Sequence, residues 1–206
     1  LTKLVPAVEL GHGSADEYLR ASLNSVVQLP TDIDPADVLE LIGRQQELSP
    51  AQLAERWREE AALTARLLDV ANSSSFRRTG KPVESLRDAI SNMGVAMALN
   101  QALALALDVA GKIDNPDLQA QARAFHDMAL QVSREAQKLA IRLGKSPSLF
   151  QQAGLLSRLG EMAVLKVLNQ FTAEGGSLNG AEVEQCIGQW SQDYGNRLKV
   201  QWKLPL

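Results

Sequence analysis

The spacing of apolar residues constrains this chain more than any other feature of its sequence. Apolar residues recur three and four positions apart, as at Leu63, Leu67 and Val70, and this spacing places them on one face of an α-helix. No sustained run alternates apolar and polar residues as a half-buried strand would. Capping residues followed by proline mark helix starts at Asp34-Pro35, Ser49-Pro50 and Ser146-Pro147. The sequence therefore predicts an all-α protein.

These helices are predicted to form one multi-helix bundle with an N-terminal helical lobe. We expect residues 1–19 to be an N-terminal extension and residues 20–206 to be the domain. Gly111 and Pro116 interrupt the helical pattern, so residues 111–116 are predicted to be a seam. A long helix is expected to follow the seam and to run toward Leu143.

Composition excludes several classes of function. A net charge of −3 argues against binding of the whole molecule to nucleic acid or to an anionic membrane. The single cysteine, Cys186, excludes an internal disulfide and a cysteine-based zinc finger. The N-terminus has no signal-peptide pattern, and Asn100 and Asp108 interrupt the most apolar stretch. We therefore expect a soluble, cytoplasmic protein without a membrane segment.

Few residues carry a chemistry that the sequence can assign. His126 and Asp127 are adjacent, as in some metal sites, but the other histidine is His12, so no metal, cofactor or catalytic set is predicted. The densest basic cluster is predicted to lie in a loop, where it is a candidate interaction surface for a phosphate, an acidic partner or nucleic acid. Its members are Arg77, Arg78 and Lys81.

Several phrases, in order, resemble the HDOD domain family over about residues 20–205. The first half of the resemblance is carried by Leu29-Pro30, the segment Glu60–Leu68, the segment Val70–Ser74 and the segment Ser85–Ile90. The second half is carried by Ala153–Gly160, by Tyr194-Gly195 and by Trp202–Pro205. The family's closing helices after that last segment are not among the 206 residues. The side chains of Asn72 and Ser73 are expected to bond local backbone, which is a structural role.

The departures from the family pattern concern its metal site. HDOD domains resemble metal-dependent HD phosphohydrolases, in which a His-Asp pair holds the metal. At the positions that the resemblance aligns with this pair, the chain has Ser157 and Arg158. Ser191 stands where a further histidine is expected. A guanidinium has no lone pair to offer a divalent cation and repels it, so the resemblance predicts a degenerate site without catalysis.

The resemblance implies a non-catalytic bacterial signal-transduction module that contacts other signalling proteins. A phosphate-containing ligand is a further candidate, with Arg158, His126 and Asp127 as its contacts. The first alternative is a divergent metal-dependent phosphohydrolase that uses His126 and Asp127. The second alternative is a helical nucleic-acid-binding or adaptor module that uses the basic loop, although the net charge disfavours nucleic acid. The oligomeric state is not predicted.

Overall fold

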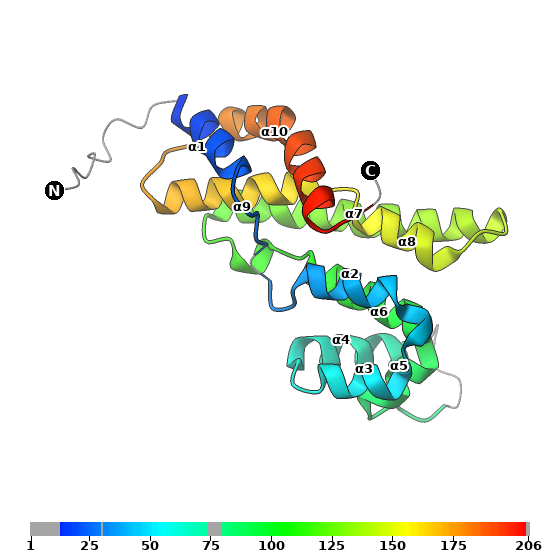
Figure 1. Cartoon of the computed structure of the whole chain (residues 1–206). Helices are drawn as coiled ribbons and strands as arrows, with labels where there is room; N and C mark the ends of the chain where they lie inside the picture. Colours follow the sequence, from blue (N-terminus) through cyan, green and yellow to red (C-terminus); the bar gives the residue numbers. More distant parts are fainter. Residues whose placement is uncertain (1–12, 30, 74–79, 205–206) are drawn as a thin grey trace. The chain divides into compact units, whose positions relative to one another are not determined.

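The computed structural model describes residues 13–29, 31–73 and 80–204, and for Gly13 and Ser14 it describes the backbone alone. Every regular element in these ranges is helical, so the all-α prediction is confirmed. The chain forms two compact units, and one boundary between them falls within the long helix α7 (Pro116–Arg142), between Val132 and Ser133. Figure 1 shows the helices coloured along the sequence.

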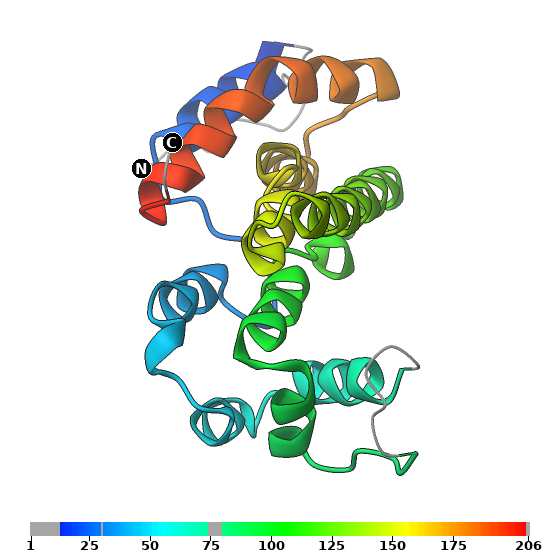
Figure 2. The same cartoon turned by 90° about the vertical axis from the view of Figure 1, so that its right-hand side faces the viewer.

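Unit 1 comprises residues 1–31, 107–132 and 156–206. Its helices are α1 (Gly13–Leu23), η3 (Ala110–Lys112), the first part of α7, α9 (Leu159–Ala173) and α10 (Gly180–Gln201). Helix α10 packs along α9, and α1 packs against both. Figure 2 shows α1 and α10 side by side. The predicted boundary between residues 19 and 20 falls inside α1, and residues 111–116 lie within this unit.

Unit 2 comprises residues 32–106 and 133–155. Its elements are α2 (Pro35–Gly43), η2 (Gln45–Glu47), α3 (Pro50–Trp57), α4 (Ala61–Asn72), α5 (Leu86–Met93), α6 (Val95–Ala106), the last part of α7 and α8 (Pro147–Leu155). Helix α8 packs on α6, where the buried Asn100 amide donates to the carbonyl oxygen of Ser148 at 3.0 Å and to the side chain of Gln151 at 3.1 Å. This pairing satisfies the polar groups in an otherwise apolar contact.

Local sequence signals set the helix ends. The Asp34 side chain accepts from the backbone N–H of Ala36 at 2.9 Å, and Ser49 forms a capping box with Gln52. Gly144, at φ +64°, ends α7, and the next N–H, that of Lys145, donates to the carbonyl of Ala140 at 2.8 Å. This is the glycine-terminated pattern in which a left-handed residue reverses the chain.

Helix α6 is strongly apolar, and most of its side chains are buried inside the protein. In the described residues no single helix is long and apolar enough to cross a bilayer. One bent pair, Leu86–Met93 with Val95–Lys112, meets the length and composition criteria, but it turns by 111°. The turn occurs at Gly94, whose φ is +88°, and Leu99 and Leu103 beyond it are fully buried.

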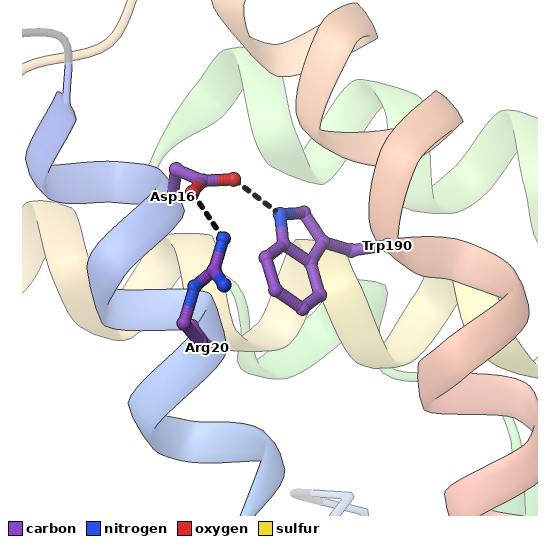
Figure 3. A network of polar contacts seen from close by, with 3 residues as sticks. All are labelled: Asp16, Arg20 and Trp190. Carbon is purple, nitrogen blue, oxygen red and sulfur yellow. Dashed lines mark hydrogen bonds and ion pairs between the residues drawn. The ribbon is translucent and has the colours of Figure 1, made fainter.

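Helix α1 is attached to α10 by polar contacts as well as by packing. The Asp16 carboxylate accepts from Nε1 of Trp190 at 2.9 Å and pairs with Arg20 at 3.2 Å (Figure 3). The Arg20 guanidinium lies 5.5 Å from the centre of the Trp190 ring. One turn further along α10, the Tyr194 hydroxyl donates to the backbone carbonyl of Leu19 at 2.8 Å. These contacts fix the position of α1 along α10.

Helices α9 and α10 approach each other backbone to backbone at Gly160 on α9. A Cβ at this position would overlap the backbone carbonyl oxygen of Ser191 and would lie 3.1 Å from the backbone nitrogen of Gly195. Both obstacles are backbone atoms of α10, which cannot move aside as a flexible side chain can. The two helices therefore need glycine at residue 160.

We expect Gly160→Ala to lower the free energy of unfolding by about 2 kcal/mol or more, because the added methyl group overpacks the contact. Thermal and chemical unfolding would measure the change. Gly188→Ala on α10 is the matched control, because a Cβ there meets nothing within 4 Å. In the control the free energy of unfolding should stay the same or rise by up to about 1 kcal/mol, since alanine favours helix more than glycine does. Equal stability of the two variants would contradict this packing.

The two tyrosines of the chain, Tyr18 and Tyr194, predict an alkaline limit to stability. Burial raises the pKa of Tyr18 to about 12, and Glu174 contributes through a hydrogen bond and its charge. Burial also raises the pKa of Tyr194 to about 12. A tyrosine in the unfolded chain ionises near pH 10. As the pH rises, the tyrosines of the unfolded chain therefore lose their protons before those of the folded chain. The contribution of the two tyrosines to the free energy of unfolding is complete below pH 10 and is lost as the pH rises through 12.

Absorbance of tyrosinate during alkaline titration tests this expectation. The native protein should show little tyrosinate at about pH 11, whereas the chain in denaturant should ionise near pH 10. Half-ionisation of the native protein near pH 10 would contradict the raised pKa values.

Candidate functional site

The sequence-predicted site residues Ser157 and Arg158 lie in the turn between α8 and α9. Arg158 precedes the first residue of α9 and occupies its N-cap position, with φ −118° and ψ 24°, without a side-chain capping bond. Ser157 is exposed, and Arg158 is partly exposed. The turn belongs to unit 1, so its neighbours on α7 and α10 can be described with it.

The Arg158 guanidinium has two partners. Its Nη1 lies 3.1 Å from Oε1 of Glu161, and the guanidinium carbon lies 6.0 Å from the centre of the Phe125 ring. The Glu161 side chain is 17% exposed and that of Arg158 is 38% exposed, so solvent screens the pair only in part. Glutamate and an aromatic ring thus neutralise and shield the cation at the position of the family's metal-binding pair.

His126 and Asp127 follow Phe125 on α7, and they differ in environment. His126 is buried, with 8% of its surface exposed, whereas Asp127 is exposed. Successive residues of a helix point about 100° apart, so this difference follows from the helical geometry. Within the described residues there is no group of three or more His, Cys, Asp or Glu side chains placed to hold a metal ion. The donor set here does not fit the divalent metal of HD enzymes.

Ser157 and Ser191 do come together. Both line an open groove of about 410 Å³ between the start of α9 and the later turns of α10, which we call the α9–α10 groove. Its other lining residues include Gly160, Gly188 and Lys199. The Ser191 hydroxyl oxygen is buried, and among the described residues it has no hydrogen-bond partner. The wall of the groove therefore covers a polar atom whose hydrogen-bonding capacity is unused.

Two features of the groove differ from the sequence-based expectation. Arg158 is not among its lining residues, whereas Lys199, which the sequence analysis did not single out, lines it. Lys199 is separated from Ser191 by eight residues, about two helical turns, so it lies on the same face of α10. That spacing is visible in the sequence, but only the packing of α9 identifies the face that forms the groove.

The basic loop is only partly described. Arg77 and Arg78 lie outside the described residues, and Lys81 is exposed. Asn72 donates from its side-chain amide to the carbonyl of Val83 at 2.9 Å and accepts from the N–H of Val83 at 2.7 Å. Asn72 thus joins the two sides of the loop, which is the structural role expected from its sequence position.

Comparison with known proteins supplies the family context. The model of the HDOD domain family matches residues 29–206. No curated protein matches the chain. Two solved structures share its fold, at sequence identities too low to carry more than the fold.

The first structure is of an HDOD domain protein with unknown function from Geobacter sulfurreducens. It is 22% identical with a TM-score of 0.64, and the match covers 95% of this chain and 67% of the other. The second structure is of a candidate metal-dependent phosphohydrolase from Shewanella amazonensis SB2B. It is 20% identical with a TM-score of 0.67, and the match covers 93% of this chain and 71% of the other.

The unpartnered hydroxyl of Ser191 yields a prediction about stability. We expect Ser191→Ala to leave the free energy of unfolding unchanged or to raise it by up to about 1 kcal/mol, because a buried unpaired polar group is removed and alanine favours helix. Ser85→Ala is the matched control, since the Ser85 hydroxyl caps α5 by accepting from the N–H of Asp88 at 3.1 Å. The control should lose about 1 kcal/mol. Equal losses in urea unfolding would contradict the assignment.

Proposed function

Because the chain belongs to the HDOD domain family, as the order of its motifs predicts, we propose that it is a non-catalytic regulatory module. In this proposal it works in signal transduction in the bacterial cytoplasm. It acts by contacting other signalling proteins or by holding a small ligand in the degenerate site, and it does not hydrolyse phosphate esters.

The observation that carries this proposal is the environment of Arg158. A permanent cation stands where the HD enzymes place a metal-binding pair, and Glu161 and Phe125 hold it in place. A divalent ion beside this guanidinium would meet repulsion of like charge, and the carboxylate nearest to it is already paired. Ser191, in the place of a further histidine, supplies a neutral hydroxyl. Metal-dependent phosphohydrolysis needs a ligand set that these residues do not provide.

Metal content tests the proposal. The purified chain would be stripped with chelator, incubated with Mn²⁺, Fe²⁺, Zn²⁺ or Mg²⁺, desalted and measured by elemental analysis. We expect far less than one ion per chain, no hydrolysis of p-nitrophenyl phosphate, and the same result for His126→Gln. His126→Ala provides a second comparison, and circular dichroism checks that both variants fold.

A stoichiometric metal that is lost in the folded His126 variants, together with metal-dependent hydrolysis, would overturn the proposal. That outcome would favour the divergent phosphohydrolase that uses His126 and Asp127.

A further inference from the structure

The α9–α10 groove has the composition of a binding site for a small anion. We propose that it binds a ligand that carries an oxyanion, phosphoryl or carboxyl, on a compact apolar body, with Lys199 as the anion's charged partner. This inference rests on the proposed function, because it names the ligand class of the same non-catalytic module. The groove's volume of about 410 Å³ lies within the range of small-molecule sites, about 300–1,000 Å³.

Lys199 supplies the charge of the groove. Within the described residues no carboxylate forms an ion pair with Lys199, whereas Glu161, the acidic residue of the lining, is paired with Arg158 at 3.1 Å. The lining itself is formally neutral, with Glu161 and Lys199, and it is the pairing of Glu161 with Arg158 from outside the lining that leaves the charge of Lys199 unopposed. Arg158, which the sequence suggested as the anion contact, is held by Glu161 and Phe125 outside the lining residues. The charged partner of an anion in the groove is therefore Lys199 and not Arg158.

Neutral donors surround the same space. Gln192 and Asn196 line the groove and are exposed, so their side-chain amides can donate to a ligand. Ser157 and Ser191 also line it, but the Ser191 hydroxyl oxygen is itself buried. The first residues of α9, Leu159 to Glu161, are in the lining as well, and helix N-termini favour negative charge. These donors match the acceptor oxygens of a phosphoryl or carboxyl group.

The remaining wall suits an apolar body. Leu156, Leu159 and Ile187 contribute apolar surface to the lining. Gly188 is also in the lining, and a Cβ added there meets nothing within 4 Å. The backbone of α10 is therefore bare at this point, and a flat ring can approach it closely. An anion attached to a small ring satisfies both the polar and the apolar part of the groove.

Calorimetric titration with phenyl phosphate tests the inference on the full chain, at low salt and with chelator present. Benzoate is the carboxyl arm, and benzyl alcohol is the neutral analogue of the same size. We expect saturable binding of phenyl phosphate, benzoate or both at millimolar concentrations, and at least tenfold weaker binding of benzyl alcohol. The stronger of the two anions identifies the oxyanion that the groove accepts.

Two variants locate the binding. Gly188→Leu should abolish it by filling the groove, and the fold should persist because the position has free space and leucine favours helix. Lys199→Met, which keeps the apolar stem, should weaken anion binding about tenfold, in line with the loss of a charged hydrogen bond. Lys145→Met is the matched control, because Lys145 is exposed and belongs to unit 2. This variant should bind the anions as tightly as the parent chain does.

Absence of binding by both anions, equal binding of benzyl alcohol, or unchanged binding in Gly188→Leu would overturn the inference. The same probe separates it from the proposed function. Hydrolysis of phenyl phosphate after addition of a divalent metal contradicts the non-catalytic module, whereas the lack of binding contradicts the groove alone. Binding without hydrolysis supports both.

Discussion

The backbone contact between α9 and α10 at Gly160 is the constraint on which unit 1 depends. Because the α9 backbone approaches the Ser191 carbonyl and the Gly195 nitrogen, the two helices cross at a position that larger residues would not allow. This crossing places Ser157 beside Ser191 and opens the α9–α10 groove at its side. Helix α1 packs against both members of this helix pair, and Trp190 and Tyr194 attach it to α10.

The segment that carries this glycine also carries Ser157 and Arg158, which the resemblance aligns with the family's metal-binding pair. Within Ala153–Gly160, Gly154 and Gly160 are packing residues, since a Cβ at Gly154 would lie 2.6 Å from the backbone nitrogen of Ser133. The fold therefore retains the glycines that the helix contacts require, while Ser157 and Arg158 between them lack metal-ligand chemistry.

Much of the fold could be predicted from the sequence. The apolar spacing of three and four predicted helices, and the starts at Asp34 and Ser49 have the expected caps. The family followed from ordered motifs, although structures with the same fold share only 22% and 20% of their residues with this chain. Of the residues that the resemblance singled out, Ser157 and Ser191 line one groove, whereas Arg158 does not. The place of Lys199 in the groove and the contact of Arg158 with Phe125 were not predictable, because they depend on contacts between helices, whereas Glu161 is a local partner three residues after Arg158.

The sequence alone therefore determined the helices, their caps and the family. These properties depend on local backbone chemistry or on residue identity, and neither requires a neighbour from another part of the chain. Only the tertiary structure decided that Arg158 lies beside Phe125 of α7 and that Lys199 lines the groove. The physical reason is that helical pitch fixes which residues share a face. The close backbone contact at Gly160 decides which faces meet.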